Sequence, residues 1–134
     1  MPSLPTVGGS SGTWGTELNT WLLTAHNADG SLKDVSQNTP TASYTLVLGD
    51  AGKVIEMNVA GANTLTVPPN ASVAFPIGTI IEVAQLGAGQ TTITPGAGVT
   101  INAPNGLKLT SRYSSCSLRK RGTNEWMLIG DTTT

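Results

Sequence analysis

From about Thr41 onward, apolar and polar residues alternate in short runs that are separated by turn residues. In the clearest run, residues 63–67, Leu65 and Val67 share one face and threonines occupy the other. No segment between the runs is long enough for the helix that usually joins parallel strands, which excludes α/β folds. Runs spaced by about ten residues are typical of a compact antiparallel β-sandwich or barrel. The expected strands are 43–48, 53–58, 63–67, 78–86, 91–94, 99–102, 107–109, 114–120 and 125–129.

The alternation also predicts an aliphatic core for this β domain. Cys116, the single cysteine, lies in a strand-like stretch and is expected to be a small buried hydrophobe. Such a core is adequate but modest, so contacts between copies could add to the stability. The expected core residues are Leu46, Leu48, Ile55, Met57, Leu65, Val67, Ile81, Val83, Ile93, Ile101, Leu118, Trp126 and Leu128.

Residues 14–26 carry a helical pattern instead. Trp14, Leu18 and Trp21 fall on one face of a short α-helix, and Leu22 widens that face. A helix of this length is unstable alone in water, so its apolar face must be buried. The spacing fits either self-association around a symmetry axis or docking on the β domain of the same chain. Two tryptophans within eight positions favour an intermolecular contact.

The residues before this helix, 1–13, are rich in proline, glycine, serine and threonine. Such a segment cannot bury enough apolar surface to fold alone, so it is expected to be an extended arm or a frayed terminus. The predicted organisation is therefore an arm and short α-helix in residues 1–40, used for attachment or oligomerisation. The β domain would follow in residues 41–134.

The sequence offers few groups for catalysis. His26 is the only histidine and lies at the expected helix end, where its charge would favour the helix dipole. Glu56 and Glu82 are expected to be solvent-facing strand residues rather than an acid and base pair. No spacing indicates a zinc or calcium site, and no glycine-rich turn leads into a helix. The sequence thus predicts no enzyme, no catalytic residue, no cofactor and no metal.

The charge and hydropathy of the chain restrict the classes of partner that it can bind. Charged residues make up only 11% of the chain and the net charge is −1, which argues against nucleic acid. No run of about 18 apolar residues is present, so no membrane span is expected. The chain also begins without the basic and apolar stretches of a secretory signal.

Four of the seven basic residues lie within ten positions near the C-terminus. This cluster fits a solvated hairpin edge, where charges discourage the addition of another strand. It also fits an anion-facing patch for an acidic glycan or for the carboxylates of a neighbouring subunit. The residues of this possible contact are Arg112, Arg119, Lys120 and Arg121.

Several spaced motifs resemble known phage sequences. Residues 12–22 and 26–30 resemble an N-terminal segment of small virion proteins and fibre proteins of tailed bacteriophages. A β module that recurs in those particles is similar to four further stretches, residues 44–48, 50–58, 65–70 and 120–130. The resemblance covers most of the chain and carries over no catalytic residue.

This resemblance implies a virion structural protein, a homotrimeric decoration or head-fibre protein bound to the outer capsid. Its partners would be other copies of itself and the major capsid protein or another virion protein. It would be made in the host cytoplasm and reside on the virion exterior. The alternative is a receptor-recognition module of a tail or head fibre that binds host-surface glycan. The β domain offers four aromatic residues for such a site: Tyr44, Phe75, Tyr113 and Trp126.

Overall fold

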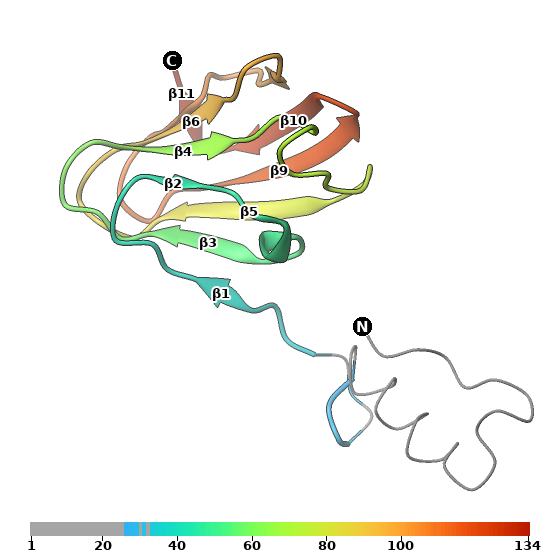
Figure 1. Cartoon of the computed structure of the whole chain (residues 1–134). Coiled ribbons are helices and arrows are strands. Elements are labelled where there is room, and N and C mark those ends of the chain that lie inside the picture. The colour runs from blue at the N-terminus through green and yellow to red at the C-terminus, as the bar shows by residue number, and fades with distance from the viewer. Residues whose placement is uncertain (1–25, 30, 32) are drawn as a thin grey trace, which may run out of the picture. The chain divides into compact units, whose positions relative to one another are not determined.

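The computed structural model describes residues 26–29, 31 and 33–134 and divides the chain into two units, 1–34 and 35–134 (Figure 1). The division expected after residue 40 falls after Asp34, because residues 37–38 form a strand of the β unit. In the first unit, the Asp29 carboxylate accepts hydrogen bonds from the Ser31 hydroxyl at 2.6 Å and the Ser31 backbone N–H at 3.0 Å. These two bonds lower the pKa of Asp29.

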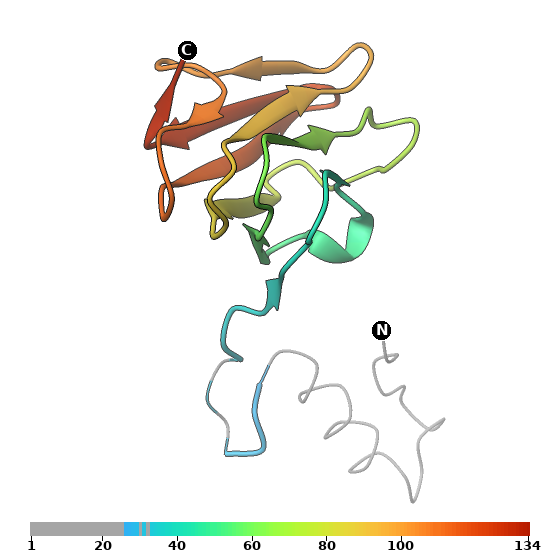
Figure 2. The same ribbon diagram turned by 90° about the vertical axis from the view of Figure 1, so that its left-hand side faces the viewer.

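The second unit is mainly β and contains two sheets (Figures 1 and 2). Sheet 1 has the order β1-β3-β5-β9-β10-β7 and sheet 2 the order β11-β8-β6-β4-β2. The strands are β1 Gln37–Asn38, β2 Tyr44–Thr45, β3 Val54–Met57, β4 Asn63–Val67, β5 Ile80–Gln85, β6 Thr91–Pro95, β7 Thr100–Asn102, β8 Lys108–Leu109, β9 Ser115–Gly122, β10 Glu125–Gly130 and β11 Thr132–Thr133.

The antiparallel arrangement predicted from the sequence is wrong, because both sheets are mixed. β1, β3 and β5 run parallel in sheet 1, and β2, β4 and β6 run parallel in sheet 2. From β1 to β6 successive strands alternate between the sheets, so the chain returns to each sheet beside its previous strand and in the same direction. The strand in the other sheet thereby makes the crossover that a helix makes in α/β folds. Only from β8 onward do the neighbours within each sheet become antiparallel, except where β7 pairs with β10.

The parallel pairing of β3 with β5 and of β4 with β6 follows an internal repeat of 28 residues. Each paired residue of β3 and β4 faces the residue 28 positions later in β5 and β6, as in the hydrogen bond from Thr91 to Asn63. The sequence shows the repeat in residues 60–66, AGANTLT, and residues 88–94, AGQTTIT. Corresponding turns stack directly: the backbone N–H of Gly89 donates to the carbonyl of Val59 at 2.9 Å.

The turns at one end of the strands form a single hydrogen-bonded column. Backbone bonds join each turn to the neighbouring turn or to the strand end beside it, for example from Asn58 to Pro40 at 2.9 Å and from Tyr113 to Gln85 at 2.7 Å. Buried polar side chains at the adjoining strand ends brace the column, as where Thr91 Oγ1 donates to Asn63 Oδ1 at 2.8 Å. The column comprises residues 39–43, 58–62, 86–90, 110–114 and 131.

Side chains from both sheets form one hydrophobic core cluster. Most of the predicted core is confirmed. Phe75, Val99 and Leu109 belong to the core although the alternation did not single them out. Phe75 comes from the loop after β4 and meets Trp126 edge to face, with ring centroids 5.6 Å apart.

Two predicted core residues are placed differently. Leu48 is 57% exposed and Ile101 is only partly buried. The run expected to be a strand over 43–48 stops at Thr45, and a short 3-10 helix, Leu48–Asp50, follows. Asp50 turns the chain there, because its buried carboxylate accepts from the Val47 N–H at 2.9 Å and from Tyr44 Oη at 2.8 Å. This turn directs Leu48 outward.

Cys116 is buried as predicted, and burial together with the charge of Glu82 raises the pKa of its thiol to about 12. We therefore expect the folded protein to resist alkylation by iodoacetamide at pH 8, whereas the chain in urea is labelled within minutes. Because the raised pKa means that the folded state retains the proton longer, stability is lost as the pH rises from about 9 toward 12. Mass spectrometry measures the labelling. Equal labelling of folded and unfolded protein would contradict the burial.

Candidate functional site

The first set of predicted contact residues lies in the N-terminal segment. Trp14, Leu18, Trp21 and Leu22 fall outside the described residues, and their role remains a prediction.

The basic cluster predicted as one patch is divided by the structure. Alternation along β9 points Arg119 and Arg121 outward and turns Lys120 into the protein, where it is 2% exposed. The Lys120 ammonium donates to Asn70 Oδ1 at 2.6 Å and to the carbonyl oxygen of Phe75 at 2.8 Å. Burial lowers its pKa. Lys120 therefore fastens the loop between β4 and β5, and its prediction as an anion contact is wrong.

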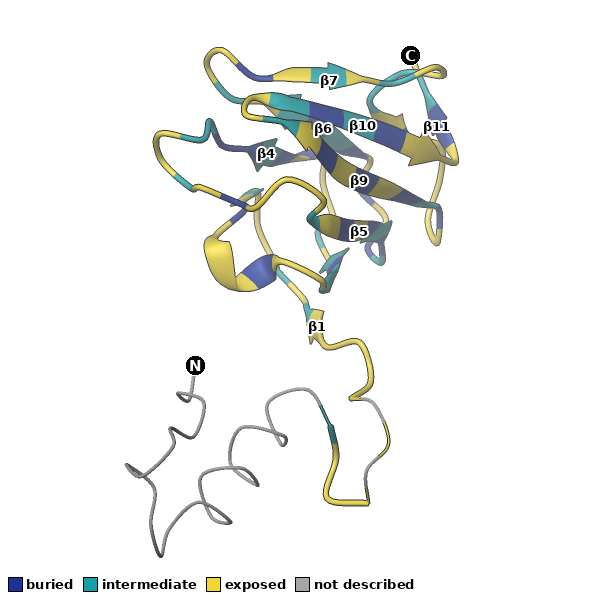
Figure 3. Cartoon of the chain, turned by 90° about the vertical axis from the view of Figure 1, so that its right-hand side faces the viewer, coloured by how far each residue is buried: buried dark blue, intermediate teal, exposed yellow. Residues whose placement is uncertain are grey.

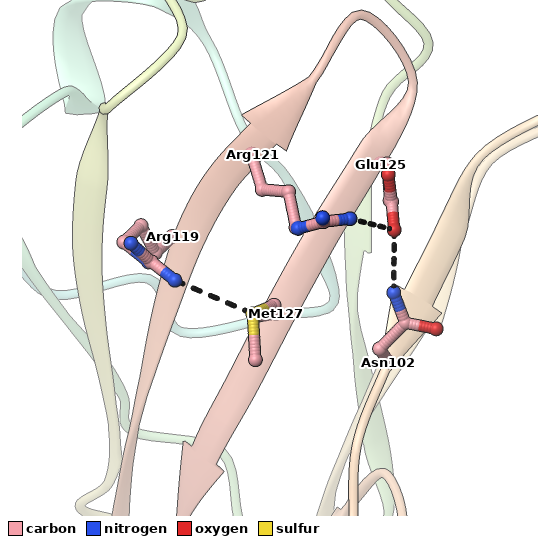
Figure 4. Close-up of polar contacts among 5 residues, drawn as sticks. All are labelled: Asn102, Arg119, Arg121, Glu125 and Met127. Atoms are coloured by element: carbon pink, nitrogen blue, oxygen red, sulfur yellow. Dashed lines mark hydrogen bonds and ion pairs between the residues drawn. The ribbon is translucent and has the colours of Figure 1, made fainter.

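The outward side chains of β9 belong to a surface that we name the outer face of sheet 1 (Figure 4). Arg119 lies between Ile80 on β5 and Met127 on β10, and its guanidinium donates to Met127 Sδ at 3.3 Å. Nearby, Arg121 pairs with Glu125 at 2.8 Å, and the same Glu125 oxygen accepts from Asn102 Nδ2 at 2.9 Å. Arg119 is thus held by a neutral sulfur while Arg121 is neutralised by Glu125.

Apolar and charged residues alternate in rows across this outer face. One row places Ile80, Arg119, Met127 and Asn102 side by side on four strands, and the next contains Val54, Glu82, Ser117 and Ile129. Ile80 is 53% and Ile129 62% exposed, and the banding of β9 and β10 is visible in Figure 3. Methionine, arginine and exposed aliphatic side chains on a regular sheet are characteristic of protein contact surfaces.

Arg112 lies away from this face, on the column of turns, next to Tyr113. The guanidinium carbon of Arg112 is 4.9 Å from the centroid of the Tyr113 ring, and Arg112 Nε donates to the Leu86 carbonyl at 2.9 Å. Tyr113 is 70% exposed and has a φ of 71°, the left-handed region that a tyrosine rarely adopts. We call these two residues the Arg112–Tyr113 corner.

A dense set of hydrogen bonds holds this corner in place. The buried Ser114 hydroxyl lies 2.6 Å from Thr110 Oγ1, accepts from the Ser111 N–H at 3.0 Å, and bonds Asp131 Oδ2 at 3.0 Å. Because several partners fix the turn, it retains a backbone conformation that costs about 1 to 3 kcal/mol. The alternation of hydrophobic residues carries no signal of this turn.

The four aromatic residues considered for a glycan site differ sharply in accessibility. Phe75 and Trp126 are buried in the core, and Tyr44 is partly buried with its hydroxyl bonded to Asp50. Tyr113 is therefore the one exposed aromatic residue among residues 33–134.

Comparison of the sequence with protein-family models and with curated proteins gives no match. In the part of the chain that the structure describes, no three His, Cys, Asp or Glu residues are grouped so as to hold a metal ion. The described residues likewise include no helix of the length and hydrophobicity that a membrane crossing requires.

Proposed function

We propose that this protein is a non-enzymatic structural component of a tailed-phage virion, a homotrimer that decorates the outer capsid. The motifs in residues 12–30 and in the β unit support this proposal by their resemblance to virion proteins. The two-unit organisation supports it as well, since one unit can attach while the other is displayed. Its partners would be its own copies and the major capsid protein or another virion protein.

The observation that carries the proposal is the outer face of sheet 1. Its exposed Ile80 and Ile129 alternate with carboxylates and guanidinium groups, so apolar contact and charge pairing are available on one surface. Both signs of charge occur on this surface, because Glu125 pairs with Arg121 and Glu82 lies on the same face as Arg119. A surface of mixed sign can face another copy of itself or a virion partner without net repulsion.

Light scattering and capsid binding test the proposal together. We expect wild-type protein to be a trimer and to bind capsids prepared without it, raising their melting temperature. Ile80→Glu with Ile129→Glu should weaken trimer formation or capsid binding by at least about tenfold. The reason is that two apolar side chains that the interface would bury are replaced by charged ones. Ile77→Glu is the matched control, since Ile77 is 66% exposed in a loop outside this face.

A parallel variant, Trp14→Ala with Trp21→Ala, tests the N-terminal segment as the association device. A monomeric wild-type protein that neither binds capsids nor alters their heat stability would overturn the proposal.

A further inference from the structure

We propose that the Arg112–Tyr113 corner is a binding site for an anionic saccharide, with the sugar ring against Tyr113 and its carboxylate on Arg112. This inference is independent of the trimer and of the outer face of sheet 1, because the corner belongs to the column of turns.

The Tyr113 side chain is displayed on the protein surface. The side chain is 70% exposed and adds nothing to the core, yet its backbone is in the left-handed region, with φ of 71°. Glycine or asparagine would adopt that conformation at lower cost. Among the described residues, Tyr113 is the one non-glycine residue with positive φ. An accessible aromatic ring held at a conformational cost indicates use of the ring on the surface.

The Arg112 side chain is held in a fixed position beside Tyr113. Its Nε donates to the Leu86 carbonyl and its guanidinium lies against the Tyr113 ring, so the side chain is anchored at two points. The terminal nitrogens make no hydrogen bond to any residue of the described part of the chain. They can bind a carboxylate in bidentate fashion, and little side-chain entropy is lost because the arginine is already ordered.

The surface around the corner consists mainly of small and polar residues. The turn itself and the neighbouring turn present the exposed Thr110, Ser111, Ala88 and Gln90, which are small or polar, whereas the exposed aliphatic residues Ile80 and Ile129 lie on the outer face of sheet 1. A ring face carries negative charge density that attracts the polarised C–H groups of a sugar. Hydroxyl and amide groups beside it can hydrogen-bond the sugar hydroxyls. A protein partner would instead favour an apolar centre, which this corner lacks.

The probe is trigalacturonate, and its methyl ester is the matched neutral ligand. Titration of the full-length, isotope-labelled chain should perturb the amide signals of residues 110–114 and 86–90, with a dissociation constant on the order of 1 mM. Arg112→Gln should abolish the preference for the acid over the ester. Lys108→Gln, which removes the same charge from an exposed position on β8, should leave binding unchanged.

The role of the Tyr113 ring is tested by substitutions that preserve the left-handed backbone conformation at this position. Tyr113→Asn, which tolerates the left-handed conformation, should lower affinity at least about tenfold, and Tyr113→Trp should retain binding. The amide spectrum of each variant establishes that the turn is intact. The proposal is overturned if neither sugar perturbs the amide signals of the corner at a concentration about 20 times the expected dissociation constant. It is equally overturned if a polyglutamate peptide binds as well as the saccharide, or if Tyr113→Asn binds like wild type.

Discussion

Gly89→Ala is expected to destabilise the protein by on the order of 3 kcal/mol or more, enough to unfold a marginal domain. A Cβ atom built on Gly89 would overlap the carbonyl oxygen and carbonyl carbon of Gly61 in the preceding turn. Those atoms are backbone, so relief requires the two stacked turns to separate. Separation would break the bond from the Gly89 N–H to Val59 and disturb the buried Asn63 and Thr91 side chains.

Gly61→Ala is the matched control for this effect. Gly61 occupies the equivalent position one repeat earlier, and a Cβ there would have no atom within 4 Å. We expect its free energy of unfolding in urea to lie within about 1 kcal/mol of wild type. Similar losses in both variants would mean that these turns do not stack as described.

Lys120→Ala should lower the free energy of unfolding by about 2 to 4 kcal/mol, because a buried hydrogen-bonded charge and its packed stem are both removed. The substitution leaves the Phe75 carbonyl and Asn70 Oδ1 without the ammonium that binds them. Since Phe75 packs against Trp126, the core loosens as well. Lys120→Met, which retains the stem, should recover part of the loss.

Lys108→Ala provides the control for the lysine substitution itself. Lys108 is exposed on β8, and its loss should change stability by no more than about 0.5 kcal/mol. Urea denaturation followed by tryptophan fluorescence measures all three variants. If Lys120→Ala proved as stable as Lys108→Ala, Lys120 would have to be solvated, and the basic cluster would again be a candidate patch.

The difference between Lys120 and its neighbours shows what alternation can and cannot predict. Period 2 along residues 115–121 places Arg119 and Arg121 on one face and Lys120 on the other, beside Leu118. The alternation therefore already separated Lys120 from Arg119 and Arg121. The prediction of one basic patch missed this because it counted the basic residues along the chain without regard to the faces of the strand. The acceptors of the Lys120 ammonium lie 50 and 45 positions away, so no local reading could supply them.

The direction of the strands shows a second limit. Short alternating strands separated by turns are compatible with both directions, and the absence of room for helices favoured an antiparallel arrangement. The repeated AGxxT segments, 28 residues apart, were the available signal for stacked parallel turns. The repeat arises because the backbone of one turn packs directly on the backbone of the next. Such packing requires only glycine and small polar residues at a few positions, so the signal in the sequence is weak.

The alternating pattern by itself determined the β class and nearly all of the core, because burial on one face of a strand requires period 2. Tertiary structure alone decided the strand order, the hydrogen-bond acceptors of Lys120 and the display of Tyr113. Each of these depends on hydrogen bonds between segments distant in the sequence, and such bonds do not alter the two-residue alternation of apolar and polar residues. A side-chain bond between two of the stacked turns, from Arg112 Nε to the Leu86 carbonyl, holds Arg112 against Tyr113.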